Sequence, residues 1–210
     1  MPNIEPFEKL TMHYDRWFEE HSGVYAEELK AVKALLPVFE NGIEIGVGTG
    51  RFAAPLSIKN GLEPSKKMAE IARGRGIDVI EGTAEAMPLP SERYDLVLMV
   101  TTICFVDNAE KALNEIYRIL RPGGSAIIGF VDKETPLGRF YQEHKSQSRF
   151  YSTARFFSAH EVETLLKKSG FVRCTARQTL FGETLDAMEG GIRSGYGKGA
   201  FVAIRCEKNA

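Results

Sequence analysis

Hydrophobic and polar positions alternate along the chain in blocks that predict strands and helices following one another. Short apolar runs, which are typical of strands, lie at residues 42–45, 58–62, 78–81, 96–100 and 125–131. Segments with helical spacing or helix-start signals lie at residues 24–36, 51–57, 65–72, 109–120 and 158–168. Regular alternation joined by short turns indicates βαβ units, and therefore a parallel sheet with helices on both faces.

The C-terminal part of the chain departs from this alternation. Residues 171–181 and 199–205 read as two long strands with no helix between them. Without a crossover helix they are expected to pair antiparallel, as a hairpin with a long loop. The predicted fold class is therefore α/β and doubly wound, with a mostly parallel seven-stranded sheet that ends in an antiparallel hairpin. We expect one domain over residues 1–210, because this length suits a single large core.

Three predicted helices begin at recognisable capping signals. Ser65 precedes the helix at 65–72 and can accept a hydrogen bond from its first turn. Asp107 with Glu110, and Ser158 with Glu161, have the spacing of a capping box. These signals predict where the helices begin.

Composition and charge exclude several classes of protein. Apolar residues make up 43% and charged residues 26%, and the net charge is −1, so no strong field attracts nucleic acid or an anionic membrane. The longest apolar run, residues 96–106, is far shorter than the roughly 20 residues that span a bilayer. The acidic start MPNIEPFEKL does not resemble a signal peptide. We expect a cytoplasmic protein, a monomer or homodimer, with neither nucleic acid nor membrane as a partner.

The cysteines do not suggest a disulfide framework or a metal site. Cys104, Cys174 and Cys206 are odd in number and far apart in the sequence. We therefore predict three reduced thiols in the core and no bound metal.

The segment NGIEIGVGTGRF, residues 41–52, is the first candidate for a ligand site. Gly46, Gly48 and Gly50 follow the first predicted strand, and glycine permits positive φ and close approach of a ligand. In a doubly wound sheet this turn lies at the carboxyl end of the strand, where the strand order reverses and ligands bind. A dinucleotide motif would carry its third glycine at the position of Arg51, so the spacing argues against a nicotinamide cofactor.

An acidic residue strengthens the interpretation as a nucleoside site. Glu63 closes the second predicted strand, 19 residues after Glu44. Folds of this type place a carboxylate at about this separation on the ribose hydroxyls of a bound nucleotide.

Five segments, in order, resemble the motifs of the class I S-adenosylmethionine-dependent methyltransferases. They are EIGVGTGRF at 44–52, LEPS at 62–65, GTAEAMPLP at 82–90, YDLVLMV at 94–100 and RILRPGG at 118–124. The likeness is strongest to the small-molecule subgroup that includes the ubiquinone and menaquinone biosynthesis enzymes. It covers roughly residues 14–171, and the segment at 14–25 resembles the part that in this family folds over the cofactor. It implies a Rossmann-like methyltransferase fold with S-adenosylmethionine as cofactor.

The resemblance assigns residues to the methionine end of the cofactor. The turn beneath it would be formed by Gly46, Gly48 and Gly50. Glu44 would order this turn and add negative potential near the sulfonium. The backbone near Met99 would meet the amino group of the cofactor, and Tyr14 its carboxylate.

Other residues are assigned to the nucleoside end. Glu63 would hold the ribose hydroxyls, with Pro64 against the adenine face. Ala84 would offer a backbone donor to the ring, and Glu85 or Thr83 an acceptor for its amino group. Many relatives carry Asp where Thr83 stands, which places more weight on Glu85. The segment 50–63 is about one helical turn shorter than the family pattern, so a trimmed first helix is expected there.

Two segments are expected to cover the site. Aromatic residues gather in residues 1–25, the predicted cofactor and substrate cover, and in residues 132–157, a predicted substrate-covering insertion. Aromatic faces suit a sulfonium or a flat apolar molecule. The candidates for contact with the acceptor are Trp17, Thr101, Phe105 and Tyr141.

The predicted reaction is an in-line displacement that carries the methyl group to a small-molecule acceptor. The enzyme's main task is then to align the nucleophile and exclude water. A general base is optional, and its candidates are His13, His144 and His21; relatives often carry a histidine where this chain has Phe105. Nitrogen, oxygen and carbon nucleophiles all remain open. The alternatives are an inactive methyltransferase-like scaffold that binds the cofactor or a partner protein and, on weaker grounds, a nicotinamide-dependent oxidoreductase.

Overall fold

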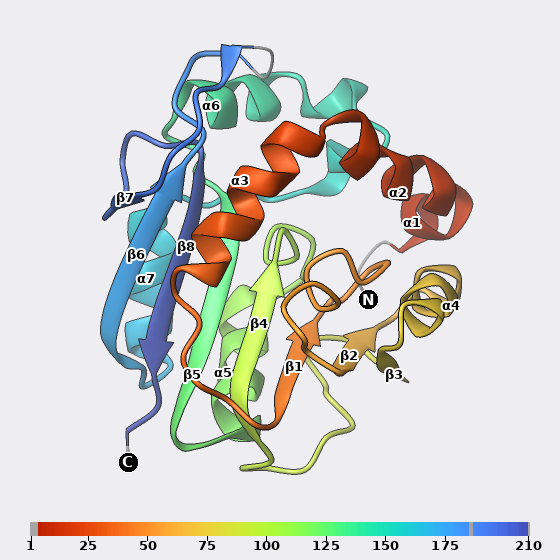
Figure 1. The fold of residues 1–210 in the computed structure, drawn as a ribbon, viewed down its shortest axis with the longest axis vertical. Helices are drawn as coiled ribbons and strands as arrows, with labels where there is room; N and C mark the ends of the chain where they lie inside the picture. The colour runs from red at the N-terminus through yellow and green to blue at the C-terminus, as the bar shows by residue number, and fades with distance from the viewer. Residues whose placement is uncertain (1–3, 185–186, 210) are drawn as a thin grey trace.

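The computed structural model describes residues 4–184 and 187–209. Within them one sheet of eight strands has the order β3-β2-β1-β4-β5-β8-β6-β7 (Figure 1). The strands are β1 (Gly42–Ile45), β2 (Asn60–Glu63), β3 (Asp78–Glu81), β4 (Tyr94–Val100), β5 (Leu120–Val131), β6 (Val172–Thr179), β7 (Arg193–Ser194) and β8 (Phe201–Glu207). The predicted doubly wound fold is confirmed.

The first five strands form the parallel part of the sheet. β1 pairs with β2 on one side and with β4 on the other, and both pairings are parallel. The strand order therefore reverses at β1, and the glycine turn that follows Ile45 lies at the switch point. This placement agrees with the sequence prediction.

The last strands form the predicted antiparallel hairpin. β8 lies between β5 and β6 and runs antiparallel to both. The eighth strand, which the sequence did not predict, is the two-residue β7 in the long loop between β6 and β8.

Helices cover both faces of the sheet. They are α1 (Glu5–Lys9), α2 (Thr11–Glu20), α3 (Ser22–Lys33), α4 (Lys66–Gly74), α5 (Ala109–Ile119), α6 (Pro136–Glu143) and α7 (Ala159–Lys168), with short 3-10 helices η1 (Lys145–Gln147) and η2 (Tyr151–Thr153). In Figure 1, α3 crosses the front of the sheet and α5 and α7 lie behind it, while α1, α2 and α6 gather beyond the end to which β4 points. No helix of the described residues is long and apolar enough to cross a membrane.

The core consists of two layers that β4 separates. Leu96 and Leu98 join the cluster on the side of α3, whereas Val97 and Met99 join the cluster on the side of α5 and α7. All four side chains are fully buried. The continuous apolar run of β4 is therefore explained by helices on both faces.

Two of the predicted helix starts are confirmed, and one is shifted by a residue. The Ser65 hydroxyl accepts from the backbone N–H of Met68, and Ser158 forms a complete capping box with the first turn of α7. At α5 the prediction was wrong, because Asn108 and not Asp107 is the N-cap: Asn108 Oδ1 accepts from the backbone N–H of Lys111 at 2.9 Å.

The predicted helix at 51–57 is also wrong. The segment forms successive turns, and Ser57 ends them with a φ of 60°. The backbone N–H of Ile58 then bonds to the carbonyl of Ala53 at 2.9 Å, and β2 begins at Asn60. With so few residues between the glycine turn and β2, the chain makes turns where a longer segment would build a helix.

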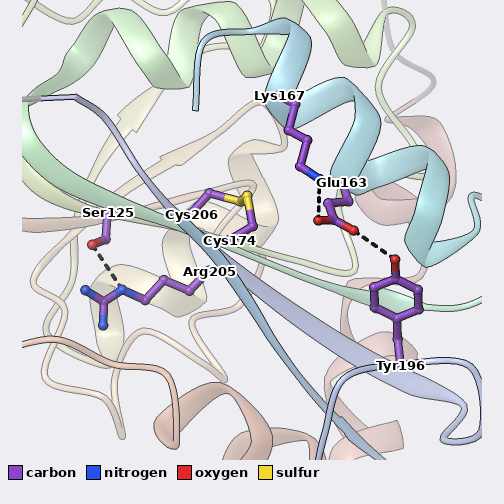
Figure 2. Close-up of a disulfide and its surroundings, with 7 residues drawn as sticks. All are labelled: Ser125, Glu163, Lys167, Cys174, Tyr196, Arg205 and Cys206. Carbon is purple, nitrogen blue, oxygen red and sulfur yellow. Dashed lines mark hydrogen bonds and ion pairs between the residues drawn. A yellow bond between two sulfur atoms is a disulfide. The ribbon is translucent and has the colours of Figure 1, made fainter. Parts of the chain in front are cut away.

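The prediction of three reduced thiols is corrected by a disulfide between Cys174 and Cys206 (Figure 2). The two residues lie on β6 and β8, which are neighbours in the sheet, and their Cα atoms are 4.1 Å apart. Their separation of 32 residues gave no hint of this, because the contact depends on strand pairing. Cys104 is the free cysteine of the described residues.

Candidate active site

The turn after β1 is held by the end of β2. The backbone N–H groups of Gly46 and Val47 both donate to the carbonyl of Leu62, at 2.8 and 3.0 Å. Gly46 has a φ of +67°, and a Cβ atom there would lie 2.3 Å from Thr102 Cγ2, so glycine is required. Gly48 has a φ of +54°, and its nearest neighbour is the Tyr14 ring at 3.8 Å, which leaves space beside it.

The carboxylate of Glu63 connects this turn with the start of α4. Glu63 Oε2 accepts from the backbone N–H of Gly48 at 2.9 Å, and Oε1 accepts from that of Ser65 at 2.9 Å. Burial raises the pKa of Glu63 to about 7, against the lowering effect of these two N–H groups, and the nearby Glu8 raises it further. Each oxygen keeps a lone pair for a ligand.

A first cavity, of about 80 Å³, opens beside this turn. Among the residues predicted to contact the cofactor, those that line it are Tyr14, Gly46, Gly48, Glu63, Pro64, Thr83, Ala84 and Glu85. Glu85 Oε1 accepts from the backbone N–H of Asp107 at 2.7 Å. Glu85 Oε2 is buried and has no hydrogen-bond partner among the described residues, so it is an acceptor available to a ligand.

Three of the predicted cofactor residues do not line a cavity in the described part of the chain. Glu44 is 2% exposed, and burial raises its pKa well above the usual range, against the lowering effect of the Ala53 N–H. Gly50 packs against α4, since a Cβ there would lie 2.5 Å from Ile77 Cδ1. Met99 is fully buried in β4. These three residues lie behind the surface that a ligand would touch.

A second, larger cavity of about 430 Å³ adjoins the first. Both cavities are lined by Phe7, Tyr14, Thr101 and Phe105. The other predicted residues that line the second cavity are His13, Trp17, Tyr141 and His144. The structure therefore brings together all the residues predicted to contact the acceptor.

Aromatic rings form much of the wall of this cavity. Phe105 stacks on Tyr151 with centroids 5.7 Å apart, and Tyr151 stacks on Tyr141 at 5.4 Å. Tyr141 belongs to α6 and Tyr151 to η2, so the segment 132–157 supplies this side. Tyr14 of α2 packs edge-on against Phe150 of the same segment, with centroids 5.7 Å apart.

The three candidate histidines lie in different surroundings. His13 stacks on Phe150 at 6.1 Å, and His144 Nδ1 lies 2.9 Å from the carbonyl oxygen of Phe140; both rings line the second cavity. His21 stacks on Trp17 at 4.7 Å and lies outside the lining of the cavities.

Sequence reasoning missed one buried residue of the second cavity, Glu28 on α3. It is 5% exposed and lines the cavity, and burial raises its pKa to about 8. The signal was present in the sequence: Glu28 interrupts the apolar stripe of Tyr25, Leu29 and Val32 in the predicted helix. A charged residue on the buried face of a helix is rare unless it is paired or functional.

An ion-pair cluster attaches α2 to the glycine turn. Asp15, which is 8% exposed, accepts from Arg51 at 2.8 and 2.6 Å and from Arg75 Nη2 at 2.8 Å. Arg75 also donates to the carbonyl of Thr49 within the turn. Arg51, the residue that breaks the dinucleotide spacing, therefore positions the N-terminal segment over the site.

Known proteins resemble this chain in both sequence and structure. A family model described as a methyltransferase domain matches residues 43–128. A crystal structure from Thermotoga maritima, described as a SAM-dependent methyltransferase and possible histamine N-methyltransferase, is 52% identical, covers 97% of this chain and 98% of its own, and has a TM-score of 0.93. The chain belongs to the class I S-adenosylmethionine-dependent methyltransferases. This membership sets aside the nicotinamide-dependent alternative.

Two further proteins are similar to this methyltransferase in sequence. An uncharacterised protein of Methanocaldococcus jannaschii is 45% identical over 96% of this chain and 98% of its own length. A ubiquinone/menaquinone biosynthesis C-methyltransferase of Stenotrophomonas maltophilia is 30% identical over 63% of this chain and 66% of its own. The expected likeness to the quinone-biosynthesis enzymes is therefore confirmed, and the cofactor of this methyltransferase is S-adenosylmethionine.

Proposed function

We propose that this methyltransferase transfers the methyl group to a small molecule bound in the second cavity. The proposal is supported by the contact between the two cavities, because four residues line both of them: Phe7, Tyr14, Thr101 and Phe105. A cofactor in the first cavity would place its sulfonium next to these four residues, close to an acceptor in the second cavity. That arrangement permits the in-line approach that methyl transfer requires.

The residues of the first cavity fit the cofactor. Glu63 has lone pairs free for the two ribose hydroxyls, and the unpartnered Glu85 Oε2 suits the adenine amino group, with the Thr83 hydroxyl as a second acceptor. Gly48 leaves room for the methionine part beside the turn. These assignments remain predictions, and their support is the chemistry of the donors and acceptors at this cavity.

The N-terminal segment would act as the cover of the cofactor. The first cavity, about 80 Å³, is smaller than the roughly 300 Å³ at which ligand pockets begin. Residues 4–25 contribute Phe7 and Tyr14 to its wall, so this segment would have to shift for the cofactor to enter. Such a cover excludes water once it closes.

The reaction needs alignment more than it needs acid–base chemistry. In such a transfer the acceptor would offer a lone pair to the methyl carbon and the thioether of the cofactor would be the leaving group, so no side chain has to form a covalent bond. When bound, the cofactor supplies the positive sulfonium that makes the methyl group electrophilic. The protein orients the acceptor between apolar walls and excludes water, which would otherwise compete as a nucleophile.

Incubation with methyl-labelled S-adenosylmethionine tests the proposal. The purified chain is offered a panel of amines, phenols and quinols, and transfer of label to small molecules is measured. We expect label in at least one acceptor class and a large loss with Glu63→Ala. If no acceptor receives label although S-adenosylhomocysteine binds, the proposal is wrong and the alternative of an inactive scaffold is supported.

A further inference from the structure

The second cavity contains a single carboxylate, that of Glu28, among the described residues that line it. The side chain comes from α3 and is 5% exposed. Its carboxylate has neither a hydrogen bond nor an ion pair with another described residue. No lysine or arginine among the described residues lines the cavity. A buried carboxyl group without a partner is costly, so its presence in a ligand-sized cavity indicates a role in binding.

The other polar groups that line the cavity are phenols, imidazoles, hydroxyls and an amide. Three phenols, those of Tyr14, Tyr141 and Tyr151, line the same cavity and remain neutral, because burial raises their pKa values. His13 and His144 also line the cavity. Both are tied to other groups: His13 stacks on Phe150, and His144 Nδ1 lies 2.9 Å from a backbone carbonyl. Among the described residues, the cavity therefore presents one carboxyl group, many aromatic rings and no lysine or arginine.

Such surroundings select for the charge of a ligand. Aromatic rings attract cations through their π electrons, and the rings of Trp17, Phe105 and Tyr141 are among those that line this cavity. A carboxylate adds a charge-assisted hydrogen bond to an ammonium group. An acceptor that carries a carboxylate or phosphate would instead find no lysine or arginine among the described lining residues to pair with, and its charge would oppose ionisation of Glu28.

We propose that the methyl acceptor is an organic amine, recognised as its ammonium form by the carboxylate of Glu28 within this aromatic wall. The inference rests on the proposed function and specifies its substrate class. A cavity of about 430 Å³ suits a small amine with an aromatic or branched apolar body. Nitrogen is then the nucleophile.

The proton balance of the reaction gives Glu28 a second role. An ammonium nitrogen has no lone pair, so one proton passes to Glu28, which becomes a neutral carboxylic acid. The free amine then attacks the methyl carbon as the carbon–sulfur bond breaks, and the product is a methylated ammonium ion beside neutral S-adenosylhomocysteine. The raised pKa of Glu28, about 8, allows it to hold the proton at neutral pH until it passes to water.

The test compares the wild-type chain with Glu28→Gln, which keeps the shape of the side chain and removes its charge. Glu20→Gln, on the exposed part of α2, serves as the matched control. Calorimetry first measures S-adenosylhomocysteine binding, and then the binding of a panel of aromatic and branched amines to that complex. Neutral alcohols, phenols and quinols of the same size are measured beside the amines. Transfer of methyl label to the same compounds provides kcat/KM.

We expect amines, and not their neutral counterparts, to bind the wild-type complex and to receive label. In Glu28→Gln, amine affinity should fall at least tenfold and kcat/KM at least a hundredfold, while the affinity for S-adenosylhomocysteine stays within twofold. Glu20→Gln should behave as the wild type. Amine binding that is unchanged in Glu28→Gln, or a wild-type complex that binds no amine of the panel, would overturn the inference. If label moves to a phenol or quinol only, the inference fails and the proposed function stands; if S-adenosylhomocysteine does not bind, both fail.

Discussion

Arg51 holds Asp15 through two nearly equal hydrogen bonds, from Nε to Oδ1 at 2.8 Å and from Nη2 to Oδ2 at 2.6 Å. The pair joins the N-terminal helix α2 to the residue that follows the glycine turn. Asp15 is 8% exposed, and Arg75 donates to the same carboxylate. Although burial opposes ionisation, the hydrogen bonds from the two arginines hold the pKa of Asp15 below its usual range. The position of the cover over the site therefore depends on this carboxylate.

Replacing Asp15 by Asn should loosen the cover and weaken cofactor binding. The change leaves Arg51 and Arg75 without their shared carboxylate, so we expect a loss of about 2–3 kcal/mol in the free energy of unfolding. Affinity for S-adenosylhomocysteine should fall about tenfold. Glu19→Gln is the matched control: this carboxylate also pairs with Arg51, but its side chain is 68% exposed, so its loss should cost less than about 1 kcal/mol. Urea denaturation measures the free energy of unfolding of both variants, and calorimetry measures their affinity for S-adenosylhomocysteine. Equal effects of the two variants would show that Asp15 does not hold the cover in place.

Binding of S-adenosylhomocysteine should depend on pH through Glu63. Burial raises the pKa of this carboxyl to about 7, so a proton occupies it increasingly as the pH falls below that value. The ribose hydroxyls need the ionised carboxylate, and the dissociation constant should therefore rise up to about tenfold per pH unit below 7 and stay level above 8.

The control for this prediction is Glu63→Gln, which should bind more weakly at every pH and with a flat profile. Calorimetry between pH 5.5 and 8.5 provides the comparison. Wild-type affinity that does not change across this range would remove Glu63 from ribose recognition.

Glu28 should make the folded chain less stable as the pH rises. The folded protein keeps the Glu28 proton up to about pH 8, whereas the unfolded chain releases it near its ordinary value of 4.5. Between these two values Glu28 is ionised in the unfolded chain and protonated in the folded one, so the free energy of unfolding falls as the pH rises. The stability that the Glu28 proton contributes is therefore complete below pH 4.5 and is lost as the pH approaches 8. Relative to Glu28→Gln, the wild type should lose on the order of 3 kcal/mol of unfolding free energy between pH 5 and 8.

Urea denaturation of both proteins at several pH values measures this difference. The other buried carboxyls with raised pKa values, Glu44, Glu63 and Asp132, are present in both proteins and cancel in the comparison. Parallel curves for the two proteins would show that Glu28 is not buried as described.

The disulfide predicts a definite count of thiols. With Cys174 and Cys206 joined, the denatured chain should show one reactive thiol, that of Cys104, before reduction and three after it. Closing a loop with a sequence separation of 32 should stabilise the fold by about 3–4 kcal/mol, so the Cys174→Ala/Cys206→Ala double variant should unfold at lower urea concentration. Three thiols in the unreduced chain would contradict the bond.

Much of the fold followed from local patterns in the sequence. β3 and α7 begin and end close to their predicted residues because a glycine turn and a capping box mark their limits. The glycine turn and Glu63 came together as expected, because parallel strands β1 and β2 end at the same edge of the sheet. Local signals and strand order were sufficient for these features.

The features that the sequence did not predict depend on contacts between distant segments. The disulfide requires the register of β6 against β8, and no local pattern specifies it. Glu28 became a candidate only when α3, α6 and η2 were seen to surround one cavity. Glu44 was expected to order the glycine turn, and the sequence did not indicate that its side chain would be buried beneath that turn. Burial of single polar residues was therefore the weakest part of the sequence-based reasoning.

The central claim is that the cofactor lies beside Gly48 in the first cavity. Gly48 lines this cavity, and a Cβ atom there would project into space bounded by Tyr14. Gly76 provides a matched control: its φ is also positive, at +81°, and no atom lies within 4 Å of a Cβ built there. Gly48→Ala and Gly76→Ala therefore introduce a similar backbone strain, and only the first adds a methyl group to the proposed site.

Calorimetric titration of the wild type, Gly48→Ala and Gly76→Ala with S-adenosylhomocysteine is the most direct measurement. We expect one site per chain in the wild type, unchanged affinity in Gly76→Ala and affinity at least tenfold weaker in Gly48→Ala. Binding to Gly48→Ala as tight as to the wild type would contradict the placement of the cofactor.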